Sequence, residues 1–209
     1  MIELYTSQGC HSCPPAEKYL NDYKNHPQLW KRYIPIAFHV DYWDYLGWKD
    51  RFAAPEHTLR QRNYAKVNRQ RAIYTPAFFV NGKPWRRGLF SAKLDSNSTT
   101  VGSLVVKLTK QDLTAQFSPT KPEQAYQLYV AVLGMDLATD IKAGENTGRH
   151  SRHEFVVLHH QVMTSQNLQW QMQVPAWSKY ETDKLSLVAW LSLPDDPRPI
   201  QAVGGFIQP

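Results

Sequence analysis

Two cysteines separated by two residues lie between an apolar run and a helical pattern, and this arrangement constrains the fold more than any other feature. Cys10 and Cys13 are the only cysteines among the 209 residues. The run Ile2–Thr6 predicts a buried strand. Apolar residues at i, i+3, i+4 and i+7 predict a helix with one buried face: Ala16, Tyr19, Leu20 and Tyr23. We therefore expect both thiols at a helix N-terminus, where free N–H groups and the helix dipole stabilise an anion.

This placement suits thiol–disulfide exchange, in which one thiolate attacks and a second sulfur resolves the mixed disulfide. Cysteines at helix N-termini have pKa values of about 3.5–7.5, compared with about 8.5 for a free thiol. We expect Cys10 to be the nucleophile and Cys13 to be the buried resolving thiol. A protonated His11 between them would favour the thiolate and make the disulfide more oxidising.

Two other roles for the cysteine pair stay open. A structural disulfide across two residues would constrain the unfolded chain little. A zinc site needs about four ligands, and the chain has no second cysteine pair. The redox role is favoured, and the sequence predicts no metal site and no cofactor.

Positive charge is concentrated in the part of the chain that holds the cysteines. Residues 1–97 contain 15 Lys/Arg and 8 Asp/Glu, whereas residues 98–209 contain 9 and 10, within a net charge of +6. Such a field supports a thiolate and attracts anionic partners. No apolar run reaches the length of a membrane span, so none is predicted.

An aromatic segment follows the second predicted strand, 34–40. That strand and the first one flank a helix, so the two are expected to be parallel. Asp41, Tyr42 and Trp43 begin a segment with four aromatic residues that follows the strand's carboxyl end, where α/β sheets hold ligands. These three residues are predicted to form a substrate wall beside Cys10, with Asp41 or His39 as a proton shuttle. A loop that only covers the core explains the aromatic residues equally well.

A basic helix and a hairpin complete the first half. The helix, 55–71, carries Arg60, Arg62, Lys66, Arg69 and Arg71. Arg62, Lys66 and Arg69 share one face, which we interpret as solvated, whereas Arg60 and Arg71 point elsewhere. No nucleic-acid partner is predicted because no recognition motif accompanies the charge. Asn81-Gly82 marks a tight turn between two strands. Pro76 precedes the first of them, where a cis proline beside Thr75 would present a backbone edge to a substrate.

With these features in place, residues 2–94 resemble the thioredoxin fold. The resemblance implies that Cys10 is the attacking cysteine, Cys13 the resolving one and Pro76 the cis proline beside the disulfide. The His-Ser dipeptide between the cysteines differs from the Gly-Pro of thioredoxins. Leu4 occupies the position of their buried Asp, which leaves Asp41 as the candidate proton acceptor for Cys13.

More narrowly, the chain resembles an uncharacterised bacterial family with a thioredoxin-like N-terminal half, often exported. The motifs that carry this resemblance are Glu3–Ala16 around the cysteines, the run 39–50, Tyr74-Thr75-Pro76 and the run 144–149. The family implies a periplasmic or secreted location, although no signal peptide precedes the first strand in the given chain. The function predicted is a thiol–disulfide oxidoreductase acting on a protein or small-molecule thiol or disulfide. The alternative is a non-catalytic thioredoxin-like binding module.

In the second half of the chain, apolar and polar residues alternate in a way that is typical of short strands. Strand patterns fall near 103–109, 113–118, 126–133, 152–161, 168–174, 185–193 and 200–207. This pattern predicts an all-β sandwich, so the fold class expected is an α/β thioredoxin-like domain, 1–97, plus a β-sandwich domain, 98–209. The loop 144–149 is expected to be a turn, or a segment that closes onto the first domain. The sequence leaves the oligomeric state undetermined.

Overall fold

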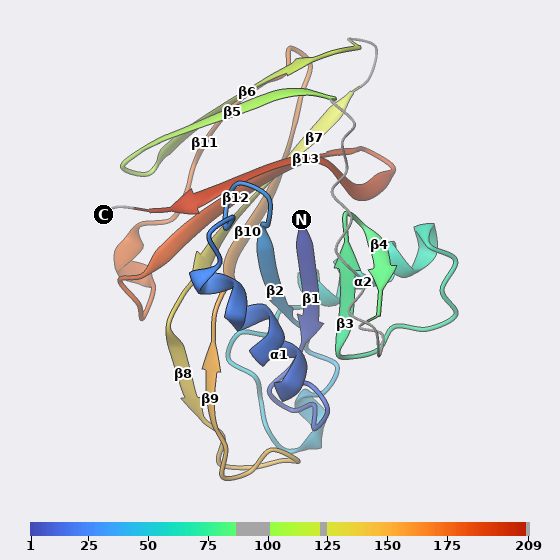
Figure 1. Ribbon diagram of the computed structural model, residues 1–209, viewed down its shortest axis with the longest axis vertical. Helices are drawn as coiled ribbons and strands as arrows, with labels where there is room; N and C mark the ends of the chain where they lie inside the picture. Colours follow the sequence, from blue (N-terminus) through green and yellow to red (C-terminus); the bar gives the residue numbers. More distant parts are fainter. Residues whose placement is uncertain (87–100, 122–124, 208–209) are drawn as a thin grey trace.

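The computed structural model describes residues 1–86, 101–121 and 125–207 (Figure 1). In the first segment, short strands alternate with helices, which include the single-turn 3-10 helices η1 and η2. The elements are β1 (Ile2–Thr6), α1 (Pro14–Asn21), η1 (Asp22–Asn25), β2 (Pro35–His39), η2 (Asp44–Leu46), α2 (Pro55–Val67), β3 (Ala77–Val80) and β4 (Lys83–Trp85). Prolines begin both α-helices, at a position where a missing N–H costs nothing.

Strands dominate the remainder of the described chain. The elements are β5 (Gly102–Thr109), β6 (Asp112–Pro119), β7 (Tyr126–Gly134), β8 (Leu137–Asp140), β9 (His150–His153), β10 (Val156–Ser165), β11 (Gln169–Gln173), η3 (Trp177–Lys179), β12 (Leu185–Leu193) and β13 (Asp196–Phe206). The sequence places nearly all of these strands correctly. The predicted strand 152–161 is in fact two strands, β9 and β10.

One mixed sheet runs through both halves of the chain, and it overturns the predicted fold class. Its eight strands follow the order β13-β12-β7-β10-β2-β1-β3-β4. β1 and β2 are parallel, as predicted, but β2 is an interior strand because Val156 of β10 pairs with Ala37 on its other side. The α/β thioredoxin-like prediction is wrong, since a separate domain of that class would end its sheet at β2.

The prediction of a separate β-sandwich is wrong for the same reason. Four of its expected strands, β7, β10, β12 and β13, continue the sheet that contains β1–β4. β5, β6 and β11 form a three-stranded sheet, and β8 pairs with β9. Figure 1 shows the three-stranded sheet lying across one end of the large sheet. The predicted boundary at 97/98 lies outside the described residues, and the division into two domains stays a prediction.

The two halves also share a hydrophobic core. Side chains of β1, β2 and β3 pack in one cluster with side chains of β7 and β12, among them Leu133 and Trp190. A second cluster fills the space between the three-stranded sheet and the other face of β7 and β12, around Leu128 and Trp170. The cysteine-bearing region is therefore supported by residues from both ends of the sequence.

A buried ion pair lies at this shared core. Nε of Arg60 donates to Oε2 of Glu3 at 3.0 Å, and both side chains are almost completely buried. The guanidinium carbon of Arg60 lies 4.9 Å from the ring centre of Trp190 and 5.3 Å from that of Tyr129. Such cation–π contacts strengthen when water is excluded. Arg60, which the sequence placed away from the solvated face of the basic helix, thus has a partner for its charge in the core.

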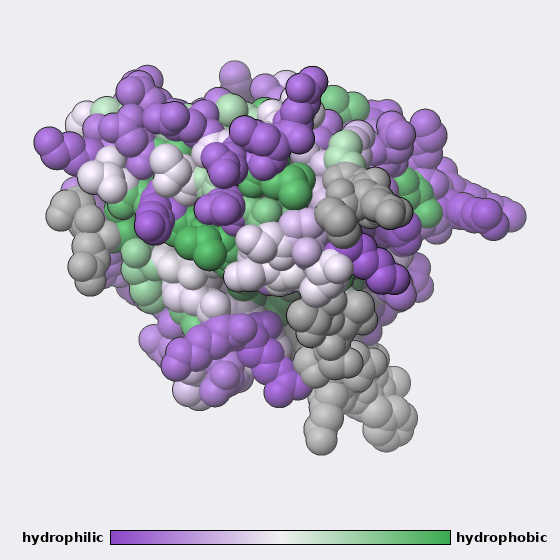
Figure 2. Space-filling model, turned by 90° about the horizontal axis from the view of Figure 1, so that it is seen from above, coloured by the Kyte–Doolittle hydropathy of each residue, from purple (hydrophilic) through white to green (hydrophobic). Residues whose placement is uncertain are grey.

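The far end of the molecule carries apolar surface. Seen from above, hydrophobic side chains gather near the middle of the face, with hydrophilic ones around them (Figure 2). An open groove of about 910 Å³ lies between β5 and β13, lined mainly by apolar residues and by Lys110 and Gln111. Separately, none of the helices in the described part of the chain has the length and apolar composition that crossing a bilayer requires.

Candidate functional site

Cys10 and Cys13 form a disulfide in the turn before α1. The N–H of Cys13 donates to the carbonyl of Cys10 at 3.2 Å, and Cys13 is the N-cap residue of the helix. Cys10 therefore lies before the cap, not at the helix start as the sequence suggested. Both residues are buried, with 3 % and 0 % of their surface exposed, whereas His11 between them is exposed.

A loop from the second half of the chain supports the cysteine turn. Asn146 is 2 % exposed, and its Nδ2 donates to the carbonyl oxygens of Gln8 and Cys10 at 2.8 and 2.9 Å. Gly144, at φ +75°, lets this loop approach Trp48, since a Cβ there would lie 3.1 Å from the Trp48 Cβ. The loop 144–149 therefore closes onto the first half of the chain, which was one of the two roles predicted for it.

Trp43 connects the cysteine turn to the predicted cis proline. A Cβ added to Gly9 would lie 3.3 Å from the Trp43 Cβ, so this tryptophan packs directly beside the residue that precedes Cys10. Its Nε1 donates to Oγ1 of Thr75 at 2.6 Å, and the Thr75–Pro76 bond is cis. Trp43 thus links the residue before Cys10 to Thr75, the residue before the cis proline.

The two other predicted wall residues make contacts with α2. The hydroxyl of Tyr42 donates to Oε1 of Gln61 at 3.1 Å, and burial raises the pKa of Tyr42 to about 12. The hydroxyl of Thr58 donates to Oδ1 of Asp41 at 2.5 Å. These two hydrogen bonds attach the start of the aromatic segment to α2. The carboxylate of Asp41 already accepts a hydrogen bond from this helix.

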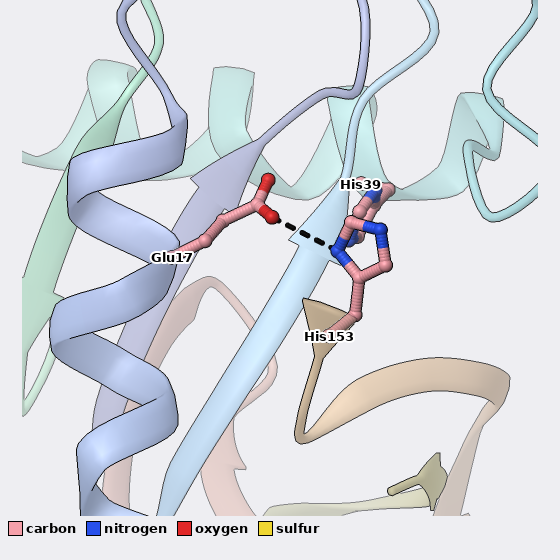
Figure 3. A group of neighbouring side chains, drawn as sticks. All are labelled: Glu17, His39 and His153. Atoms are coloured by element: carbon pink, nitrogen blue, oxygen red, sulfur yellow. Dashed lines mark hydrogen bonds and ion pairs between the residues drawn. The ribbon is translucent and has the colours of Figure 1, made fainter. Parts of the chain in front are cut away.

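A buried polar cluster lies one helical turn beyond Cys13. It comprises Glu17 of α1, His39 of β2 and His153 of β9, and one ligand-type atom of each lies within 4.8 Å of the others (Figure 3). Nδ1 of His153 lies 2.9 Å from Oε2 of Glu17, and Nδ1 of His39 lies 2.6 Å from Oδ2 of Asp50. Carboxylate and imidazole groups in this arrangement are typical ligands of transition metals.

Contacts within the cluster lower the pKa values of the two carboxylic acids and raise the pKa of His39. Burial alone would raise the pKa values of Glu17 and Asp50, but the adjacent His153 and His39 hold both below their usual values. Burial alone would lower the pKa of His39, yet the charge and hydrogen bond of Asp50 raise it. Each carboxylate is therefore maintained as an anion by its histidine partner.

A basic cleft opens beside the disulfide. It has a volume of about 450 Å³ and lies between α1 and the segment 149–152. Pro14, the residue after Cys13, lines it together with Lys18, Arg149 and Arg152, and Glu17 forms part of its floor. A ligand in this cleft would meet three positive charges next to the cysteine turn.

Comparison with family models identifies the family of the chain. A model described as "Protein of unknown function (DUF1223)" matches residues 1–192. The chain belongs to this family. The membership agrees with the resemblance to an uncharacterised family seen in the sequence. None of the curated proteins matches the chain.

Two solved structures share the fold of this DUF1223 member. Protein AGR_C_4864 from Agrobacterium tumefaciens is similar with a TM-score of 0.72 and 22 % identity, covering 99 % of this chain and 92 % of that one. HBP35 of Porphyromonas gingivalis is similar with a TM-score of 0.65 and 13 % identity, covering 98 % and 73 %. At these identities the likeness concerns the fold alone.

Sequence reasoning found the cysteine pair and singled out His39 as a possible proton shuttle, but it missed Glu17 and His153. Glu17 lies four residues after Cys13, so both belong to the same face of α1, and an acidic residue there is a detectable exception to the apolar pattern. His153 was left without a role, because nothing in its local sequence indicates a partner. Asn146 was in a segment already singled out, but its two hydrogen bonds depend on tertiary structure.

Proposed function

We propose that the protein is a thiol–disulfide oxidoreductase whose reactive groups are Cys10 and Cys13. The observation that carries this proposal is the disulfide across two residues directly before α1. A loop this short adds little stability by constraining the unfolded chain. A disulfide in this position is therefore better explained by chemistry than by structural support.

The reaction transfers two electrons between the Cys10–Cys13 pair and a partner, one of which is a dithiol while the other is a disulfide. In the reduced protein, the Cys10 thiolate attacks a partner's disulfide, which forms a mixed disulfide and releases one partner thiolate. The Cys13 thiolate then attacks the Cys10 sulfur and releases the second, so that the partner is reduced and the pair is oxidised. The reverse sequence oxidises a partner's dithiol. Cys10 is the attacking residue because it keeps some exposure, 3 %, whereas Cys13 has none.

The basic cleft supports an anionic substrate. Lys18, Arg149 and Arg152 line it together with Pro14, the residue that follows Cys13. Positive groups at this position attract a partner with carboxylate groups and accelerate its encounter at low ionic strength. The substrate class proposed is therefore an acidic small thiol or an acidic protein segment around a cysteine.

The test combines trapping with turnover. The Cys13→Ser variant is expected to accumulate a mixed disulfide through Cys10 with an acidic peptide disulfide, detected by intact mass. The wild-type protein should resolve that species, and Cys10→Ser should form none. A Cys13→Ser protein that forms no adduct, together with wild-type protein that neither reduces nor oxidises the peptide, would show that the pair has a structural role.

Charge reversal tests the substrate class separately. Arg152→Glu is expected to slow the reaction with an acidic peptide disulfide about 10-fold at low salt, and to leave the reaction with a neutral peptide nearly unchanged. Equal effects on both peptides would remove the cleft from the proposal and leave the cysteine chemistry intact.

A further inference from the structure

The starting observation is a pair of acids buried in the cluster beyond Cys13. Glu17 and Asp50 are 9 % and 1 % exposed, and each is an acid. In the described part of the chain, their ion-pair partners are imidazoles, His153 for Glu17 and His39 for Asp50, and neither carboxylate pairs with a lysine or arginine. Two buried negative charges need positive charge close by, because an isolated buried ion is strongly unfavourable.

A second observation points to a ligand at the same place. Nε2 of His39 is buried and has no hydrogen-bond partner among the described residues, and the residue is 1 % exposed. Its other nitrogen, Nδ1, is committed to Asp50 at 2.6 Å. Asp50 is itself fixed by the backbone N–H groups of Gln8 and Phe52 at 2.8 and 2.9 Å. The imidazole is therefore held in place through Nδ1, and Nε2 is the nitrogen that is left to bind a ligand.

The outer atoms of Glu17 and His153 are held in a similar way. Oε1 of Glu17 accepts from the hydroxyl of Thr6 at 2.6 Å, which leaves Oε2 toward His153. Nε2 of His153 lies 3.2 Å from Nε2 of Gln8. Metal-binding side chains in proteins characteristically have a second partner that orients them, and a carboxylate behind a histidine is the commonest arrangement.

From this geometry we propose that Glu17, His39 and His153 bind a divalent transition-metal ion, with Zn²⁺ as the probe of choice. The donor atoms are Oε2 of Glu17, Nε2 of His39 and Nδ1 of His153. Two imidazoles and one carboxylate are a ligand set that suits zinc and leaves a fourth position open. With both histidines neutral, a divalent cation balances Glu17 and Asp50.

Metal binding changes the hydrogen bonds of His153. Nε1 of Trp48, which can only donate, bonds to Oε1 of Gln8 at 2.9 Å. The amide nitrogen of Gln8 therefore donates to Nε2 of His153, and Nδ1 carries the proton that is shared with Glu17. When the metal ion binds to Nδ1 of His153, the proton moves from Nδ1 to Nε2. The side-chain amide of Gln8 must then rotate by about 180° so that its oxygen accepts this proton, and the hydrogen bond from Trp48 is lost. Glu17 lines the basic cleft, so the metal ion is expected to enter through this cleft. Binding is expected to be slow, because the hydrogen bonds of His153 and Gln8 must rearrange first.

The experiment uses the full chain with the Cys10–Cys13 disulfide intact, so that neither sulfur is available as a ligand. Chelator-treated protein is equilibrated with Zn²⁺ and titrated calorimetrically, and Co²⁺ is added in parallel. We expect one ion per chain and visible Co²⁺ absorption of a four- or five-coordinate site. Asp50→Asn, behind His39, should weaken Zn²⁺ binding about 10–100-fold.

Matched variants test whether the binding belongs to this cluster. His153→Gln and the near-isosteric Glu17→Gln should weaken Zn²⁺ binding by more than Asp50→Asn does. His150→Gln on the same strand, an exposed residue paired with Asp140, should bind like the wild type. Absence of stoichiometric binding to the wild type would overturn the proposal, and so would binding that persists in Glu17→Gln and His153→Gln. The wild-type Co²⁺ spectrum decides the case even if a variant fails to fold.

Discussion

Replacing His160 with Phe should remove a specific loss of stability in acid. The ring of His160 stacks against those of Tyr129 and Trp190, at centroid distances of 5.7 and 5.6 Å. Its Nε2 is buried without a partner. Burial, followed by the positive charge of Arg60, lowers the pKa of His160 from 6.5 to about 3. Folded protein thus holds this imidazole neutral at pH values where the unfolded chain protonates it.

The sign and size follow from proton linkage. The pKa is depressed in the folded state, so the stabilisation is complete above pH 6.5 and is lost as the pH falls from 6.5 toward about 3. Lowering the pH to 5 moves about 1.5 units below the unfolded pKa, which corresponds to about 2 kcal/mol. Part of the His160 surface remains in contact with solvent, so we expect about 1–2 kcal/mol.

Urea unfolding at pH 7.5 and pH 5.0 measures this quantity directly. The wild-type free energy of unfolding should fall by about 1–2 kcal/mol more than that of His160→Phe over this interval. Phe preserves a flat ring for the stack, and contributions from the other histidines cancel between the two proteins. Parallel pH dependence of the two proteins would refute the assignment of a buried neutral His160.

Two further predictions concern buried polar contacts. Asn146→Ala removes both hydrogen bonds to the carbonyls of Gln8 and Cys10, and should destabilise the protein by about 1–3 kcal/mol in urea unfolding; an unchanged midpoint would show that water replaces the amide. Arg60→Met leaves Glu3 buried without its cation and should cost about 3–5 kcal/mol, whereas adding Glu3→Gln to it should recover a large part. A double variant no more stable than Arg60→Met would contradict the pairing.

The individual elements were predictable from the sequence because local patterns determine them. Ile2–Thr6, the Asn81-Gly82 hairpin and most later strands follow from apolar alternation and turn residues. The pairing of β2 with β10 was not predictable, because nothing local to either strand indicates a partner over 100 residues away. The sequence predicted that the strand 34–40 runs parallel to the first strand, and it gave no indication of β10 on the other side.

The same distinction between local and long-range information applies to the residues of the candidate site. Cys10, Cys13 and Pro76 carry signals in their immediate sequence. His39 and Asp50 were both within the singled-out run 39–50, yet their 2.6 Å contact depends on how the loop folds back. Arg60 appeared as one of several charges on a basic helix, and only the packing of α2 against β13 shows that it is buried. For His39, Asp50 and Arg60, contacts with residues distant in the sequence determine the chemical environment.

The support that Asn146 gives to the cysteine turn has a consequence for the order of events during synthesis. Cys10 leaves the ribosome early, but the residue that binds its carbonyl is translated 136 residues later. Domains are made from the N-terminus, and distant contacts form late because closing a long loop is entropically costly. The nascent chain therefore carries both thiols in an incompletely supported turn until the segment through β10 has been made. The cysteines are expected to be most accessible to oxidants and to incorrect pairing during this interval.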